Sequence, residues 1–168
     1  MSRIYNRRAQ QGISMIEILI AILVLAVGAL GFAGVQVVAM QKSENANYRS
    51  SAMLIAQDAV ERIQANTAAL NEYLAVDPVK VPENPPEQAC ADACSISALD
   101  LSQLAWTVDR SLPNGKIKID DCEFNGMKCV VLNWGNQEEG VNNIADCTSN
   151  NGINLADDAN CLVMEFSR

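Results

Sequence analysis

Apolar residues form one unbroken segment near the start of the chain. No charged residue occurs from Ile18 to Met40, and Glu17 stands directly before this stretch. As an α-helix the segment would extend about 35 Å, at about 1.5 Å per residue, which is enough to cross the hydrocarbon core of a bilayer. An ionisable group at the edge of such a segment is energetically expensive, so Glu17 is a candidate functional residue.

After this segment the pattern becomes amphipathic. Its apolar stripe has one polar member and the alternating three- and four-residue spacing of a helix face: Met53, Ala56, Val60, Ile63, Thr67, Leu70 and Leu74. The small and polar members of the stripe argue against a coiled-coil zipper. Because Pro78 ends the pattern, we expect one helix from about Ser14 to about Leu74, with Asp58 and Arg62 paired on its outer side.

A second helix is predicted after a proline-rich linker, residues 77–87. The segment Ser97-Ala98-Leu99-Asp100 resembles a capping box, with aspartate in the usual glutamate position. Pro113-Asn114-Gly115 is a strong stop signal, so the helix should end there. The helical apolar series between these two signals is Leu101, Leu104, Ala105, Val108 and Leu112.

Strand patterns follow the second helix. Ile117 and Ile119 alternate with charged residues, and Asn125-Gly126 favours a type I′ hairpin turn into a second strand, Met127 to Trp134. A long loop rich in Gly, Asn and Asp (residues 135–160) then precedes a last short strand, Cys161 to Phe166. The chain is therefore predicted to have an α+β fold, in which a long N-terminal helix packs on a small antiparallel sheet with a second helix.

Charge is distributed unevenly around the apolar segment. Arg3, Arg7 and Arg8 precede it and only Lys42 closely follows it, and the flank richer in Lys and Arg stays in the cytoplasm. We therefore expect a cytoplasmic N-terminus and an exported C-terminal part. The chain has 12 basic and 20 acidic residues, a net charge of −8. This balance disfavours direct binding of nucleic acid, because phosphate contacts need clustered Lys and Arg.

Cysteines occur only in the part of the chain that this charge bias would export. An even number of them there favours disulfide bonds in an oxidising compartment. Zinc is disfavoured because histidine is absent and the cysteines do not form paired Cys-x2-Cys units. The expected turn places Cys122 directly opposite Cys129. If each cysteine pairs with its neighbour in the sequence, the disulfide bonds are Cys90–Cys94, Cys122–Cys129 and Cys147–Cys161. We expect the protein to bind no cofactor.

The start of the chain carries a further pattern: Gly12, the tetrapeptide Ile13-Ser14-Met15-Ile16, and Glu17 directly before the apolar helix. This pattern resembles the class III signal of type IV pilins and pseudopilins. The resemblance implies cleavage after Gly12 by a prepilin peptidase and N-methylation of Ile13. It also implies an assembly role for Glu17, through pairing with the free amino terminus of an adjoining subunit.

This signal divides the chain into four parts. Residues 1–12 are the expected leader, and residues 13–40 the membrane-spanning and filament-core helix. Residues 41–76 continue that helix in amphipathic form, and residues 77–168 form the periplasmic head. The subunit is expected to cross the bacterial inner membrane once, with a cytoplasmic N-terminus, and later to enter a pilus filament.

Three longer motifs stand in the N-terminal half: Ser14-Met15-Ile16-Glu17-Ile18-Leu19-Ile20-Ala21, Val27-Gly28-Ala29-Leu30-Gly31-Phe32-Ala33-Gly34-Val35-Gln36 and Ala59-Val60-Glu61-Arg62-Ile63-Gln64-Ala65-Asn66. Together they resemble the minor pilin V family of type IV pilus modification proteins. The resemblance implies a minor pilin that enters the filament or primes it, with roles in pilus biogenesis, twitching motility and adhesion. Its implied partners are other minor pilins, the major pilin, the inner-membrane assembly platform and the prepilin peptidase.

Two alternatives remain open at this point. A minor pseudopilin of a type II secretion system would carry the same signal, and some pseudopilins bind calcium, for which Asp146, Asp157 and Asp158 are weak candidates because they lack the usual loop spacing. A membrane-anchored periplasmic enzyme is strongly disfavoured. Without histidine the usual Ser-His and Cys-His nucleophile pairs cannot form.

Overall fold

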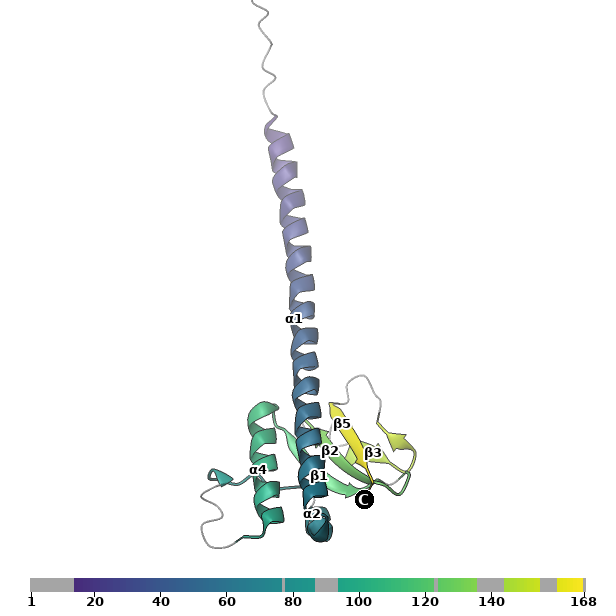
Figure 1. Ribbon diagram of the computed structural model, residues 1–168. Coiled ribbons are helices and arrows are strands. Elements are labelled where there is room, and N and C mark those ends of the chain that lie inside the picture. Colours follow the sequence, from purple (N-terminus) through teal and green to yellow (C-terminus); the bar gives the residue numbers. More distant parts are fainter. Residues whose placement is uncertain are drawn as a thin grey trace, which may run out of the picture. The chain divides into compact units, whose positions relative to one another are not determined.

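The computed structural model describes residues 14–76, 78–86, 94–122, 124–135, 144–154 and 160–167. The chain divides into two units, Met1–Glu44 and Asn45–Arg168. Helix α1 (Met15–Ala65) contributes residues to both units (Figure 1). We describe each unit by itself.

In the first unit, the described residues are helical from Met15 and their side chains face outward. Leu25 is 72% exposed and Leu30 is 74% exposed. Helix α1 is long and apolar enough to cross a membrane, and its most apolar window has none of its residues buried within the chain. Because no polar residue occurs between Glu17 and Gln36, every side of this part of the helix presents hydrocarbon.

In the second unit, the first helix does not run on to Leu74 as the sequence had indicated. Helix α1 ends at Ala65, and Asn66 leaves the helical region with φ −129° and ψ 53°. A short 3-10 turn, η1 (Thr67–Ala69), leads into α2 (Leu70–Leu74). Asparagine favours such breaks because its short polar side chain competes with the backbone ladder for hydrogen bonds.

The buried face of α1 also differs from the predicted stripe. Met53 is 49% exposed, and Thr67 is exposed on η1. The face that packs on the head is instead made mainly of small residues, which bring the helix close to its neighbours: Ala52, Ile55, Ala56, Ala59 and Ile63.

Helix α4 (Ile96–Ser111) has its N-cap two residues before the Ser97 of the expected capping box. Ser95 is its N-cap, and its side chain accepts a hydrogen bond from Ala98 N. The predicted apolar series is buried along the whole helix, from Leu101 to Leu112. After the helix, Asn114 adopts φ 50° and Gly115 approaches closely, since a Cβ on Gly115 would lie 2.7 Å from Val108 O.

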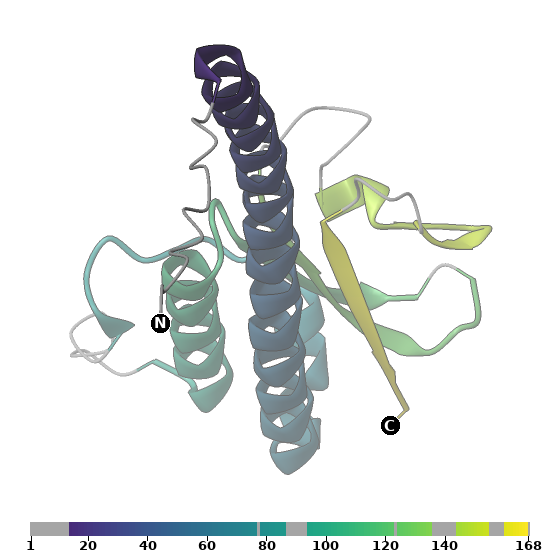
Figure 2. The ribbon, with the colours of Figure 1, turned by 90° about the horizontal axis from the view of Figure 1, so that it is seen from above.

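Three antiparallel strands form the main sheet, in the order β1-β2-β5. They are β1 (Lys116–Asp121), β2 (Lys128–Asn133) and β5 (Cys161–Phe166). The last turns of α1 lie between α4 on one side and the strands β2 and β5 on the other (Figures 1 and 2). The fold is thus α+β, as the sequence predicted, with a long N-terminal helix and a small antiparallel sheet.

The region predicted as one long loop contains structure of its own. Its described residues include a 3-10 turn, η2 (Ile144–Asp146), and a two-stranded hairpin, β3 (Thr148–Ser149) and β4 (Gly152–Ile153). The two ends of the region meet on the same rung of the main sheet, where Trp134 N donates to Asn160 O at 3.1 Å.

Strand β2 is buried on both faces, which gives the head two apolar clusters. Val130 and Leu132 face the larger cluster, together with Ile117 and Ile119 of β1 and residues of α1, α2 and α4. The opposite face of β2 meets a smaller cluster, defined by Cys122, Cys129, Val131, Ile144, Cys147 and Cys161. Side chains alternate between the two faces of a strand, and both faces of β2 are buried. Its sequence is therefore a nearly continuous apolar run.

Candidate functional site

Glu17 lies in the first turn of α1 and is exposed. Its backbone N–H donates to Ser14 O at 3.0 Å, so the residue is held at the helix start, where the partial positive charge of the helix favours a carboxylate. Neighbouring apolar side chains in the first two turns are also largely exposed; Met15 is 81% exposed and Leu19 is 65% exposed. Gly12 and Ile13, the expected cleavage and methylation positions, lie outside the described residues.

A polar junction in the head joins α1 to α4 through Arg62. Arg62 Nε donates to Asp58 Oδ2 at 3.0 Å, and Nη1 donates to Asp100 Oδ1 at 2.9 Å and Gln103 Oε1 at 2.7 Å. The Asp58–Arg62 pair was expected, but the contacts with α4 were not. Burial disfavours the charged guanidinium, but the hydrogen bonds and charges of Asp58 and Asp100 outweigh it and raise the pKa of Arg62.

Tyr73 completes this junction from α2. Its hydroxyl donates to Asp100 Oδ2 at 2.6 Å, and the residue is fully buried. Burial and the hydrogen bond to Asp100 raise the pKa of Tyr73 to about 12, because both favour the neutral phenol. Both carboxylate oxygens of Asp100 are therefore engaged, and Asp100 ties α4 to α1 and α2 instead of capping its own helix.

Glu72 holds the start of α4 from α2. It accepts hydrogen bonds from Ser97 Oγ and, at 3.1 Å, from Ser95 Oγ. Ser97 is 1% exposed, so its hydroxyl needs a partner inside the head. Sequence reasoning missed Glu72 and Tyr73 because their partners are 23 or more residues away and no local spacing marks them.

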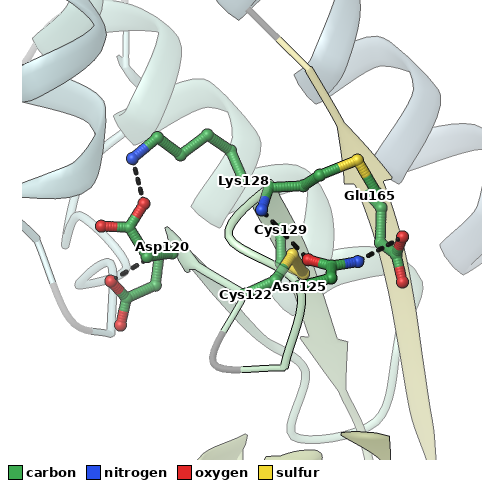
Figure 3. The surroundings of a disulfide bond; sticks show 8 residues. Asp120, Cys122, Asn125, Lys128, Cys129 and Glu165 are labelled. Atoms are coloured by element: carbon green, nitrogen blue, oxygen red, sulfur yellow. Dashed lines mark hydrogen bonds and ion pairs between the residues drawn. A yellow bond between two sulfur atoms is a disulfide. The ribbon is translucent and has the colours of Figure 1, made fainter.

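The hairpin between β1 and β2 carries a disulfide bond between Cys122 and Cys129, with a Cα–Cα distance of 5.3 Å (Figure 3). Its register differs from the one expected. Asp120 is the partner of Cys129, and Cys122 N donates to Met127 O at 2.7 Å. The two cysteines are therefore diagonal neighbours and do not face one another directly, and diagonal neighbours are still close enough to bond.

The expected two-residue turn does not form because only one of its central residues has a positive φ. Gly126 has φ 73°, whereas Asn125 stays outside the left-handed region that a type I′ turn requires. Asn125 instead accepts a hydrogen bond from Met127 N at 3.0 Å and donates to Glu165 Oε2 at 2.9 Å. Figure 3 shows this Asn125 amide reaching Glu165 on β5, which ties the hairpin loop to the far strand.

Charged side chains flank this hairpin. Lys118 pairs with Asp120 at 3.0 Å, and Lys128 pairs with Asp121 (Figure 3 shows the surroundings of Asp120 and Lys128). Burial of Asp120 favours its neutral form, but the hydrogen bonds from Lys118 and from Asp121 N–H outweigh that effect and lower the pKa of Asp120. Charge on an edge strand such as β1 also discourages pairing with foreign strands.

A second disulfide joins Cys147, after η2, to Cys161 at the start of β5, with a Cα–Cα distance of 5.6 Å. Cys94 is disulfide-bonded as well, but its expected partner, Cys90, lies outside the described residues. Asp157 and Asp158, two of the weak calcium candidates, also lie outside them. Within the described ranges, no group of three or more His, Cys, Asp or Glu side chains could hold a metal ion.

Two family models match the chain in adjacent stretches. Residues 7–33 match the model described as Prokaryotic N-terminal methylation motif, and residues 34–105 match the model described as Type IV pilin Tt1218. These matches support the type IV pilin family. That family is structural and not enzymatic, and its fold agrees with the long apolar helix and antiparallel sheet of this chain. The comparison with curated proteins and the comparison with solved structures gave no match.

Proposed function

We propose that this pilin is a minor subunit of a type IV pilus, of the minor pilin V type. One observation carries the proposal. From Met15 to Met40, α1 turns large apolar side chains outward on all sides, and no part of the head covers those that are described. Such a surface is stable only in lipid or among other apolar helices, and a subunit that moves from membrane to filament uses both environments.

Processing in this proposal follows the signal at the start of the chain. A prepilin peptidase cuts after Gly12 on the cytoplasmic side, and Ile13 is then N-methylated. The head is periplasmic, which agrees with the basic residues before the apolar segment and with the disulfide bonds Cys122–Cys129 and Cys147–Cys161. The partners are other minor pilins, the major pilin and the inner-membrane assembly platform.

Glu17 sets the position of the incoming subunit in this proposal. A carboxylate at the membrane edge can reach headgroups and water, but in a dry filament core it needs a cation, because a lone buried charge is strongly unfavourable. The amino terminus at Ile13 of an adjoining subunit supplies that cation. The alternative role, a favourable interaction with the helix N-terminus alone, is worth only about 0.3–1 kcal/mol.

The experiment compares Glu17→Gln with Glu61→Gln, an exposed glutamate in the head part of the same helix, and with Gly12→Val. All three are made in the full chain in its native cells. We expect Gly12→Val to remain as uncut precursor in the inner membrane. We expect Glu17→Gln to be cut normally but to be depleted from sheared pili about tenfold or more, whereas Glu61→Gln enters pili normally.

Each outcome tests a separate part of the proposal. Mature-sized Gly12→Val protein would overturn the cleavage site. Full recovery of Glu17→Gln in sheared pili would overturn the pairing role of Glu17. Absence of the wild-type protein from pili, together with a secretion defect on its deletion, would replace the pilus assignment with a type II secretion pseudopilin.

A further inference from the structure

The head contains an open groove of about 890 Å³ at the C-terminal end of α4. Three parts of the head line it: the segment Pro78–Val81, Ala105 and Asp109 of α4, and residues 114–117 at the start of β1. The volume falls within the range of protein sites that bind a ligand or a short peptide segment.

The walls of this groove are fixed by the fold. Val79 N donates to Ile117 O at 3.1 Å, which attaches the extended segment to the outer edge of β1. On the other side, Gly115 packs so closely on Val108 of α4 that an added Cβ would overlap it. Val79 is 8% exposed, but Val81, two residues further along, is 40% exposed. The groove is thus preformed and offers an apolar surface beside exposed backbone.

Two lysines that line the groove are the unusual feature. The other described head lysines form ion pairs, Lys118 with Asp120 and Lys128 with Asp121, and Arg110 stacks on Trp106 at 4.6 Å. The ammonium groups of Lys80 and Lys116, by contrast, have no hydrogen bond or ion pair to any residue that the structure describes. Asp109 is the one carboxylate among the lining residues, against two cations that have no partner among the described residues. In a chain with 20 acidic and 12 basic residues, this local excess of positive charge favours an anionic occupant.

We propose that this groove binds an extended acidic segment of a neighbouring pilin subunit. Carboxylates of that segment pair with Lys80 and Lys116, and an apolar side chain between them packs on Pro78 and Val81, the exposed apolar residues of the lining. The inference rests on the proposed assembly into a filament, since only there is a second subunit held beside the head. The groove would then hold the heads of neighbouring subunits together, in addition to the contacts between their apolar helices.

The test places a photo-crosslinking amino acid, p-benzoylphenylalanine, at Val81 of the full chain in its native cells. Crosslinked products are isolated from sheared pili and mapped by mass spectrometry. The same probe is combined with Lys80→Glu plus Lys116→Glu, and with the matched control Lys80→Arg plus Lys116→Arg. We expect a crosslink to an acidic segment of another pilin subunit that falls about fivefold to tenfold in the glutamate variant and persists in the arginine variant.

Several results would overturn the inference. They are a crosslink confined to this chain's own residues, a crosslink to a segment without carboxylates, and a crosslink equally strong in both lysine variants. If the probe-bearing protein is present in pili but gives no crosslink, the groove proposal fails while the filament assignment stands. If the protein is absent from pili, the filament assignment fails first, and the groove proposal fails with it.

Discussion

The two parts of α1 use similar apolar side chains in opposite ways. Before Gln41, residues such as Leu25 and Leu30 are more than 70% exposed, whereas Ile63, near the end of the same helix, is 1% exposed. The later part has a small-residue face that its own head covers, and the earlier part has no such cover among the described residues. The fold of the head therefore depends on the second part, while the first part leaves its hydrocarbon surface available to lipid or to other molecules.

The part of α1 in the head contributes to folding stability, whereas the first part of α1 contributes to interactions with other molecules. Burial of apolar surface contributes about 25 cal/mol per Å², and in the head that contribution is already made within one chain. In the first unit, the free energy of burying apolar surface is gained only when the helix enters lipid or packs among other apolar helices. Substitutions should consequently act on folding in one region and on assembly in the other.

The largest expected effect comes from matched leucine truncations in the two regions. Leu104 is 1% exposed in the centre of α4, and Leu25 is 72% exposed. Leu104→Ala should lower the free energy of unfolding of the head by about 2–5 kcal/mol, because it removes buried methyl groups and leaves a cavity. Leu25→Ala should change it by less than about 0.5 kcal/mol. Urea unfolding of the full chain in detergent micelles, followed by tryptophan fluorescence, measures both values.

Trp134 suits this measurement because it is 1% exposed and follows β2 directly. A similar loss of stability in both variants would contradict the separation of the two regions. If neither variant differed from wild type in its free energy of unfolding, the core around Leu104 would not be what stabilises the head.

The next effect concerns the smaller apolar cluster of the head. The Cys147–Cys161 bond closes a loop with a sequence separation of 14, so Cys147→Ser plus Cys161→Ser should cost about 3 kcal/mol. Cys122→Ser plus Cys129→Ser should cost slightly less, because their separation is 7. The same urea titration measures both losses. Peptide mapping without reductant checks the pairing, and a peptide that joins Cys122 to Cys94 or Cys161 would contradict it.

The smallest effect concerns the polar junction. Tyr73→Phe removes the hydrogen bond to Asp100 and should cost about 1–2 kcal/mol at pH 8. Because the pKa of Tyr73 is raised to about 12, its contribution is complete below about pH 10, where the unfolded tyrosine ionises, and disappears as the pH rises through about 12. The stability difference between wild type and Tyr73→Phe should therefore shrink over that range. A difference that stays constant up to about pH 12 would contradict the role of the phenol.

Local periodicity was sufficient to predict much of the fold. The apolar series of α4 is buried from Leu101 to Leu112, Ile117 and Ile119 face the larger cluster, and the last strand has the bounds expected of it, Cys161–Phe166. In each case the pattern depends on residues a few positions apart. The α+β class followed from these segments and is confirmed.

Features that depend on distant residues were not predictable in this way. The break at Asn66 allows Leu70 and Tyr73 to reach the core, and Glu72 reaches α4 across the linker. The Asn125 side chain, expected only as a turn residue, bonds to Glu165 on a strand 40 residues away, and no local spacing marks that partner. The expected processing and assembly residues, Gly12, Ile13 and Glu17, belong to a local signal, and their roles stay predictions until the variants are tested.

The hydrogen bond between Trp134 N and Asn160 O, at 3.1 Å, also has a consequence for the length of the segment between these residues. The connection from Trp134 to Asn160 is therefore closed at this end of the sheet, and Cys161, the first residue of β5, is bonded covalently to Cys147. The entropy of closing such a loop grows only logarithmically, by about 0.6 kcal/mol for each doubling of its length. Apart from the core residues Ile144 and Cys147, the intervening segment can therefore change in length at a small cost in free energy while β2 and β5 keep their pairing.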